Sequence, residues 1–188
     1  MKNVFKKYIK MLDKSDNVIV SRQGDYYFIG NGYIVVSVSA AIYNVYFQTE
    51  KPYYRDLQDN TSIQSIRGKR KEGILFEERS FLDYNKCFPD PFDLRPCKQT
   101  TFLFDTPDYH NYRTNLFTSE NKVIAVNSVF VDALNDITTF YSNTTISSTN
   151  AEFSPIIYSD TDFKALVMPV RHNINKDIVN ALINANME

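Results

Sequence analysis

The side chains best suited to chemistry gather in the irregular middle of the chain. They are Asp83, Asp90, Asp93, Asp105, Asp108 and His110, with Arg95 and Arg113 nearby in sequence. Carboxylates and a histidine can bind a divalent metal for phosphoryl transfer or hydrolysis. Each of these aspartates, however, stands beside Pro, Tyr or Phe, in a turn context where Asp is expected to hydrogen-bond the backbone. A metal-dependent hydrolase that uses these middle loops is therefore one interpretation, and structural turns are the other.

Cys87 and Cys97 are the only cysteines, and their separation fits no zinc-binding spacing. Only His110 and His172 could complete a metal site. We expect two free thiols in or near a loop, with a disulfide as the alternative. The sequence contains no GxSxG, Walker-type or HExxH motif, and its five glycines leave little for a phosphate-binding loop. These observations predict no catalytic residue, no metal and no cofactor.

The composition favours a strand-rich α+β fold. The 188 residues fit one domain, and 43% are hydrophobic, with 13 Tyr, 14 Phe and many Val and Ile. A net charge of -1 excludes the global positive field of a non-specific nucleic-acid binder. Because no stretch is long and apolar enough to span a membrane and the N-terminal lysines are dispersed, we expect a soluble, cytoplasmic protein without a membrane partner.

The N-terminal residues 2–14 have the pattern of an amphipathic helix. Its apolar positions are Val4, Phe5, Tyr8, Ile9 and Leu12. Its other faces carry Lys2, Lys6, Lys7, Lys10 and Lys14. This lysine face is either simply solvated or turned toward phosphates.

A three-stranded meander follows this helix, over residues 18–21, 26–30 and 33–38. Asn31-Gly32 between two β-rich runs predicts a type I′ hairpin turn, in which both residues need a positive φ. Ser39 is placed to cap a short helix over residues 40–47.

Regular periodicity fades between residues 50 and 99. This region holds a basic cluster at Arg67, Lys69, Arg70 and Lys71, which could bind phosphate or an acidic partner but is equally typical of a solvated loop. One strand is predicted over residues 74–76, and three prolines then exclude regular structure. We interpret the region as an irregular insertion.

Regular pattern returns with strands over residues 100–104, 112–118 and 123–126. Asn127 or Ser128 caps a helix to about Phe140, which has Val131, Leu134 and Ile137 on its apolar side and Asp132 and Asp136 on the other. Strands over residues 144–149 and 153–171 follow, the latter folded at the polar turn 159–162. The last helix, capped by Asn173 or Asn175, has Ile178, Val179, Leu182 and Ile183 on one face.

The two ends of the chain repeat one order of elements, a helix followed by a three-stranded meander. Chance recurrence of a common arrangement is the alternative to a duplicated architecture. We divide the single domain into a first unit of about 1–48, an insertion of about 50–99, a second unit of about 100–171 and a C-terminal helical extension, 172–188.

The segments VIAVNSVFVDALNDI, SPIIYS and ALVMPVR are similar to the last part of bacterial DNA sliding clamps. The resemblance covers about Lys122 to Arg171 and includes the Met-Pro-Val-Arg motif. It implies a clamp-like domain of two helix-plus-meander units whose helices lie side by side on one sheet face. It further implies a non-enzymatic DNA-replication protein that acts by oligomerisation and by contacts with DNA and partners. Our hypothesis includes a phage-associated protein or one from a mobile element.

The resemblance also implies two sites. The lysine face would contact DNA phosphates, and Met168, Pro169, Val170 and Arg171 would form a cleft for short peptides of replication proteins. A ring would need six such domains and therefore a homo-hexamer.

Three features of this chain depart from the family pattern. Asp132 and Asp136 on the second helix do not suit a DNA-facing surface, which leaves an interaction or assembly module without DNA binding as an alternative. The chain continues after Arg171, so its last helix could cover the cleft, as regulation or as core completion. The first helix lacks a preceding strand, which residues 100–104 or 112–118 could supply.

Overall fold

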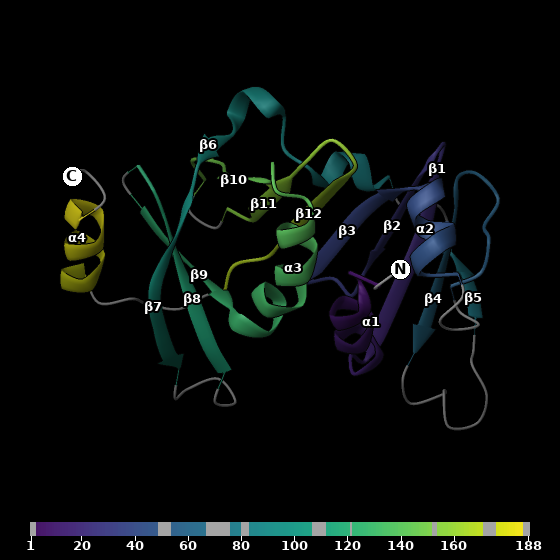
Figure 1. Cartoon of the computed structure of the whole chain (residues 1–188), viewed down its shortest axis with the longest axis horizontal. Helices are drawn as coiled ribbons and strands as arrows, with labels where there is room; N and C mark the ends of the chain where they lie inside the picture. Colours follow the sequence, from purple (N-terminus) through teal and green to yellow (C-terminus); the bar gives the residue numbers. More distant parts are fainter. Residues whose placement is uncertain are drawn as a thin grey trace.

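Two antiparallel sheets and four α-helices make up the described part of a computed structural model (Figure 1). It describes residues 3–48, 54–66, 76–79, 83–106, 112–120, 122–151, 154–170 and 176–185. The helices are α1 (Lys6–Asp13), α2 (Ala40–Tyr46), α3 (Ser128–Phe140) and α4 (Lys176–Ala185). The predicted α+β class, with strands dominant, is confirmed.

Nine strands form the larger sheet, in the order β5-β4-β1-β2-β3-β12-β11-β10-β6. They are β1 (Asn17–Gln23), β2 (Tyr26–Gly30), β3 (Ile34–Ser39), β4 (Thr61–Ile66), β5 (Phe76–Arg79), β6 (Arg95–Pro96), β10 (Thr145–Ser148), β11 (Ile156–Ser159) and β12 (Phe163–Val167). The smaller sheet contains β7 (Lys98–Thr106), β8 (Tyr112–Ser119) and β9 (Lys122–Asn127) in that order. Two short 3-10 helices, Tyr84–Cys87 and Pro91–Asp93, lie between β5 and β6.

The two predicted meanders meet at the centre of the larger sheet. β3 pairs with β12 in antiparallel register, with Val36 opposite Ala165. The order β1-β2-β3-β12-β11-β10 therefore runs through one meander and back through the other, and the helix before each meander, α1 or α3, packs against its counterpart (Figure 1). The predicted repeat of helix and meander is present in the order of the elements.

Alternation along the strands buries one face of this sheet under the helices. Val20, Ile29 and Val36 join one apolar core with Leu12 of α1 and with Phe5, the residue before α1. All the apolar positions predicted for this helix are buried. The Tyr8 hydroxyl donates a hydrogen bond of 2.6 Å to the Ile29 carbonyl, which satisfies the polar end of a fully buried ring.

The N-terminal caps predicted for α2 and α3 are present, and in each a side chain accepts a backbone N–H of the helix. The Ser39 hydroxyl accepts from the Ile42 N–H of α2 at 3.4 Å, and Asn127 accepts from the Val129 N–H of α3 at 2.9 Å. The caps proposed for the last helix, Asn173 and Asn175, lie outside the described residues.

The β2–β3 turn differs from the expected type I′ geometry. Of Asn31 and Gly32, only Gly32 has a positive φ, of 89°. The Asn31 N–H donates to the Ile34 carbonyl at 3.1 Å, so Gly32 and Tyr33 are the central residues, as in a type II′ turn. The Asn31 side chain accepts from the Tyr33 and Ile34 N–H groups, which explains why the asparagine precedes the turn instead of forming its centre.

Two further expectations were wrong. The region predicted to be irregular contains β4, which pairs with β1 along its whole length. The strands over residues 100–104 and 112–118 do not complete the first unit, because they are β7 and β8 of the smaller sheet. Residues 74 and 75 of the predicted strand over 74–76 lie outside the described residues, and β5 begins at Phe76.

The smaller sheet carries α4 on one face. Ile178 and Leu182 of α4 pack with Leu116, Val123 and Ala125 in an apolar cluster separate from the main core.

No helix in the described part of the chain is long and apolar enough to cross a membrane.

Candidate functional site

The Met168–Val170 segment connects the two sheets through backbone hydrogen bonds. The Met168 N–H donates to the Tyr33 carbonyl at 2.8 Å, and the Val170 N–H donates to the Ala125 carbonyl of β9 at 2.8 Å. The Met168 side chain is 41% exposed, whereas Pro169 and Val170 are half-buried. Arg171, the last residue of the predicted cleft, lies outside the described residues.

Two aromatic residues adjoin this segment and were not predicted to belong to the cleft. The Tyr33 ring, 64% exposed, stacks on the Phe130 ring of α3 with 6.3 Å between centroids and 15° between planes. Val129, 48% exposed, precedes Phe130 in the first turn of α3. Val129 and Phe130 therefore make apolar surface beside an exposed tyrosine whose carbonyl accepts the Met168 N–H.

A groove of about 610 Å³ opens beside the stacked rings, at the junction of α1, the β2–β3 turn and the start of α3. Met11, Tyr33, Val129 and Phe130 supply apolar lining, and Asn17, Asn31 and Asn127 supply amides. The Asn17 Oδ1 atom is buried and accepts no hydrogen bond from the described residues. An apolar wall facing amide groups can bury a hydrophobic side chain of a peptide and bond its backbone.

Sequence signals for Tyr33, Val129 and Phe130 existed but were weak. Tyr33 follows directly on an Asn-Gly turn, and Val129 lies off the helix face defined by Val131, Leu134 and Ile137, whereas Phe130 lies on that face and packs against the core. An apolar residue outside the buried face marks exposed surface, but sequence alone does not bring two such residues together.

The C-terminal helix does not cover this cleft. α4 packs on Leu116 and Ala125 of β8 and β9, and Met168 stays exposed. The expected role of the extension as a cover of the Met168 edge was therefore wrong, because Ile178 and Leu182 find their apolar partners on the smaller sheet.

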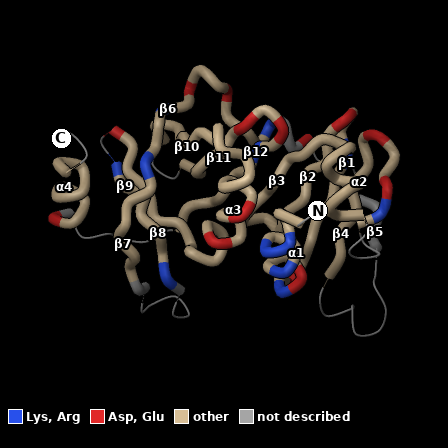
Figure 2. The backbone as a smooth tube through the Cα atoms, in the orientation of Figure 1, with Lys and Arg blue, Asp and Glu red and all other residues tan. Residues whose placement is uncertain are grey.

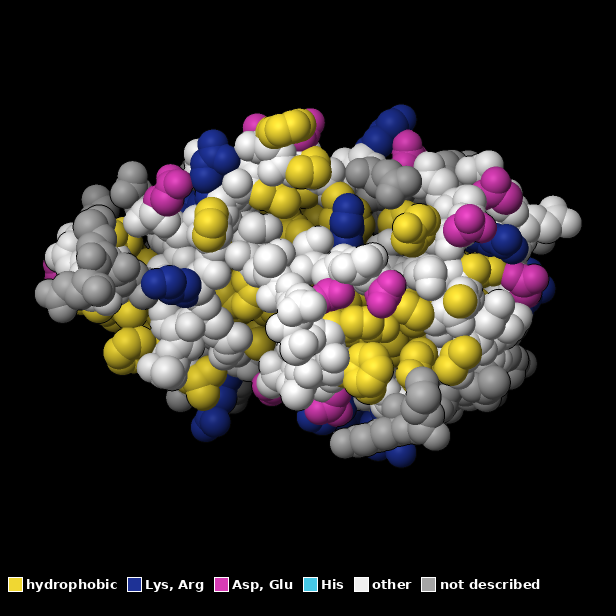
Figure 3. All heavy atoms as spheres, turned by 45° about the horizontal axis from the view of Figure 1, so that its top comes forward, with side chains coloured by type: hydrophobic (Ala, Val, Ile, Leu, Met, Phe, Trp, Pro, Cys, Tyr) yellow, Lys and Arg dark blue, Asp and Glu magenta, His cyan; other side chains and the backbone are white. Residues whose placement is uncertain are grey.

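The predicted lysine face lies on α1, where Lys6, Lys7 and Lys10 are exposed, and Lys14 is exposed directly after the helix. Lys2 lies outside the described residues. The Lys7 ammonium forms an ion pair of 2.8 Å with Asp136 of α3, the helix that also exposes Asp132. Figure 2 shows these opposite charges on the two neighbouring helices, and in Figure 3 the charges of both signs are interspersed on the face drawn.

Two aspartates of the middle loops have structural partners. Asp83 forms an ion pair of 3.4 Å with Lys86, and Asp90 accepts from the Phe92 N–H at 3.0 Å. Arg95 lies 3.8 Å from Glu120. Asp108 and His110 lie outside the described residues, and the described part of the chain holds no group of three or more His, Cys, Asp and Glu side chains arranged for a metal.

Cys97 and Lys122 belong to a buried polar cluster that sequence did not indicate. Both cysteines are free thiols, as predicted, and burial raises the pKa of Cys97. The Lys122 ammonium, whose pKa burial lowers, donates to the Ser154 hydroxyl at 2.7 Å and to the Ala151 carbonyl at 3.0 Å. Ser154 is only 1% exposed, and its contact with the partly buried Lys122 holds the turn before β11 in place.

The comparisons with known proteins found similar structures alone. No family model matches the chain, and no curated protein matches it. One similar structure is DNA polymerase III subunit beta from Borrelia burgdorferi, at 12% identity and a TM-score of 0.41, covering 91% of this chain and 63% of that one. Another is DNA polymerase III, beta subunit from Thermotoga maritima, at 14% identity and a TM-score of 0.42, with the same coverage of 91% and 63%.

A DNA polymerase III subunit beta sliding clamp from Bartonella birtlesii is also similar, at 12% identity and a TM-score of 0.36. The alignment covers 93% of this chain and 65% of that one, so the chain spans less than two thirds of the length of these structures. The likeness is weak and assigns neither a ligand nor an activity. Residues 122–171 resemble bacterial sliding clamps in sequence. The structures to which the chain is weakly similar include a sliding clamp.

Proposed function

We propose that this chain is a non-enzymatic, clamp-like protein of DNA replication that acts through contacts with partner peptides and DNA and through oligomerisation. The exposed Met168 beside the Tyr33–Phe130 stack carries the proposal. Exposed aromatic and methionine side chains around a groove are typical of surfaces that bind a peptide by burying its apolar residues. The motif adjoins the groove through Tyr33, which lines the groove and accepts the Met168 N–H at its carbonyl, although Tyr33 is distant from the motif in sequence.

The peptide contact is tested by selecting a displayed hexapeptide library on the wild-type protein. Peptides that bind it are then measured on Tyr33→Ser and Met168→Asp variants. We expect at least tenfold weaker binding to each, because both changes remove apolar contact area. Val45→Ser is the matched control, since Val45 is 58% exposed on α2, away from the groove. Peptides that bind both cleft variants as well as wild type would refute the cleft.

The DNA contact is proposed for Lys6, Lys7 and Lys10. Changing all three to Glu should weaken binding to a 30-base-pair duplex more than tenfold at 50 mM NaCl and reduce the salt dependence, since each lost phosphate contact removes about 0.9 from the slope. A control with the same charge change replaces the exposed Lys86, Lys98 and Arg113 by Glu. Equal binding by the two triple variants would exclude a DNA-facing role for α1.

A second candidate function, an interaction module without DNA binding, is favoured by one contact. Asp136 neutralises Lys7, and the exposed Asp132 further lowers the positive potential along the paired helices. This function predicts no salt-dependent DNA binding by the wild-type protein, together with unchanged selection of peptides at the Met168 cleft.

A further inference from the structure

The loop before β6, residues 88–95, holds a phenylalanine side chain out from the protein. Phe92 is 89% exposed, more than any other large hydrophobic residue that the structure describes. Its N–H donates to the Asp90 carboxylate at 3.0 Å, and its carbonyl accepts from the Arg95 guanidinium at 3.1 Å. The Asp93 N–H donates to the Asp90 carbonyl at 2.9 Å. The backbone that carries Phe92 is therefore fixed by hydrogen bonds within the loop.

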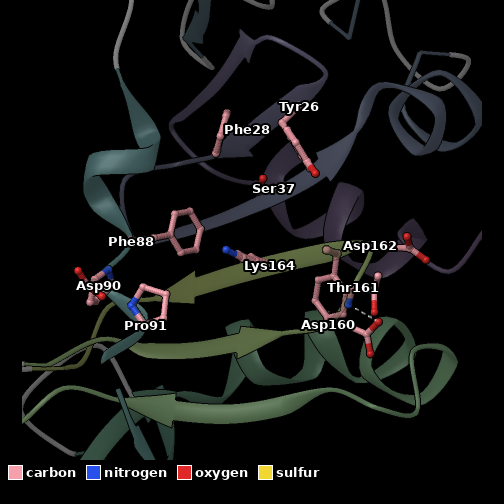
Figure 4. A pocket seen from close by; sticks show the side chains of 12 residues that line it. Tyr26, Phe28, Ser37, Phe88, Asp90, Pro91, Asp160, Thr161, Asp162 and Lys164 are labelled. Carbon is pink, nitrogen blue, oxygen red and sulfur yellow. Dashed lines mark hydrogen bonds between the residues drawn. The ribbon is translucent and has the colours of Figure 1, made fainter. Parts of the chain in front are cut away.

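Phe88 anchors this Phe92 loop to the larger sheet. It packs against Phe28 and Val35, on the sheet face opposite the helix-covered core. Figure 4 shows the Phe88 ring beside the strands, with Asp90 and Pro91 next to it. A loop that is already ordered loses less entropy when one of its side chains binds. An exposed aromatic ring on such a loop adds nothing to the core and is typical of a residue that enters a partner's pocket.

The groove beside the Tyr33–Phe130 stack suits this ring. Its apolar wall consists of Met11, Tyr33, Val129 and Phe130, and its volume of about 610 Å³ is in the range of pockets that enclose a ligand. The Tyr33 ring is 64% exposed. It can therefore pack a further aromatic ring, as aromatic pairs in protein interfaces do.

Two other cavities suit an acidic aromatic loop less well. A cavity of about 400 Å³ that Phe88 borders is lined by Asp90, Asp160 and Asp162, which repel the carboxylates of a second loop. A cavity of about 360 Å³ beside β4 has mainly polar lining residues, namely Arg55, Asp56, Gln58, Thr61 and Ser62. Neither offers an apolar wall without an excess of acidic groups or polar side chains.

The charges around the groove are compatible with the loop. Asp90 and Asp93, on either side of Phe92 in the loop, are exposed. Lys14 and Asp16 line the groove with opposite charges, and the exposed Lys10 lies one helical turn before Lys14. The groove therefore lacks the acidic excess of the other cavity, and its lysines favour the approach of an acidic loop.

The Phe92 loop and the groove of one chain lie far apart. In Figure 1 the loop is at the top, next to β6, and α1 is below the middle of the picture. We propose that the Phe92 loop of one copy binds the groove of a second copy, with the Phe92 ring against Tyr33. Loop and groove are different surfaces, so the contact is heterologous and can continue from copy to copy, as a ring requires. This inference rests on the proposed oligomerisation and names the two surfaces that carry it.

The test uses chains that carry Leu103→Lys, so that pairing of β7 edges does not add to the mass. These chains should still associate in sedimentation equilibrium at 500 µM. Phe92→Ser and Tyr33→Ser should each weaken this association at least tenfold, because each removes one side of the contact. An equimolar mixture of the two should form dimers and nothing larger, since one intact loop meets one intact groove. Phe140→Ser, a change at a phenylalanine that is 54% exposed at the end of α3, is the matched control.

Three results would overturn the proposal. They are a Leu103→Lys chain that is monomeric at 500 µM, association that Phe92→Ser leaves unchanged, and a mixture that stays monomeric although both variants keep the melting temperature. Both replaced side chains are mainly exposed, so neither change is expected to unfold the protein. Binding of the displayed hexapeptides to Phe92→Ser decides separately on the peptide contact, because this variant keeps the groove and lacks the competing loop.

Discussion

Buried tyrosines in this protein differ in whether their hydroxyl has a partner. The Tyr8 hydroxyl bonds the Ile29 carbonyl, whereas the Tyr158 hydroxyl is buried and accepts or donates no hydrogen bond within the described residues. The Tyr158 ring still packs edge-on against Phe117, with 6.4 Å between centroids. The ring therefore stabilises the core while its hydroxyl is costly to bury.

We expect the same chemical change to act in opposite directions at these two positions. Tyr8→Phe should lower the free energy of unfolding by about 1 kcal/mol, because it removes a buried hydrogen bond. Tyr158→Phe should leave it unchanged or raise it by up to about 1 kcal/mol, because it removes an unsatisfied hydroxyl. Urea denaturation at pH 7 measures both, and a clear loss of stability in Tyr158→Phe would contradict the prediction.

Stability should fall in alkaline solution. Burial, and secondarily Asp162, raises the pKa of Tyr141 to about 12, and burial also raises the pKa values of Tyr43 and Tyr158 from the ordinary 10.0. Between pH 10 and 12 the unfolded chain therefore loses phenolic protons that the folded chain keeps. The stabilisation that these groups contribute is complete below pH 10 and declines above it. Urea denaturation at pH 8 and pH 11 checks the sign, and equal midpoints would contradict it.

Two glycines near the β2–β3 turn serve different physical needs. A Cβ at Gly30 would lie 2.2 Å from the Ile34 carbonyl oxygen, so β2 and β3 approach too closely there for any side chain. Gly32 has a φ of 89° but nothing within 4 Å of its hypothetical Cβ. One glycine is required for space and the other for backbone conformation.

These needs predict unequal costs. Gly32→Ala should cost about 1 to 2 kcal/mol, the penalty for a left-handed L-residue. Gly30→Ala should cost more than 3 kcal/mol, since the β2–β3 pairing must shift to relieve a backbone clash. Thermal and urea denaturation of both variants measure the difference, and an equal loss would show that the strands can separate at Gly30 without penalty.

Strand β4 shows why some elements escape sequence patterns. Its residues Ser62, Gln64 and Ser65 are polar and buried, and the Ser62 hydroxyl bonds Ser21 of β1. A periodicity argument treats polar residues as exposed and finds no alternation. The meander strands and the α1 and α3 helices were predictable because their buried positions are apolar.

Oligomerisation is the question at the scale of the whole molecule. β7 is an edge strand of the smaller sheet, and its Phe102 and Leu103 are 59% and 55% exposed. An edge strand with exposed apolar side chains readily pairs with another chain. We therefore expect the solution mass to exceed the 21.8 kDa of one chain.

Light scattering at 50 µM protein measures this mass. A value six times that of the chain would support a ring of clamp-like domains. Leu103→Lys should shift the mass toward one chain, because it places a charge on the edge, and Val45→Ser should not. A monomeric wild-type protein would argue against a ring.

The sequence by itself determined the elements whose buried faces are apolar and periodic, the Ser39 cap and the Met168 motif, and it narrowed the cap of α3 to Asn127 or Ser128. These depend on interactions between residues close in sequence. Only the tertiary structure decided that β3 and β12 pair, that Asp136 neutralises Lys7, and that Tyr33 stacks on Phe130 next to Met168. The pairing of the two meanders brings these distant residues together, and local propensity carries no record of such contacts.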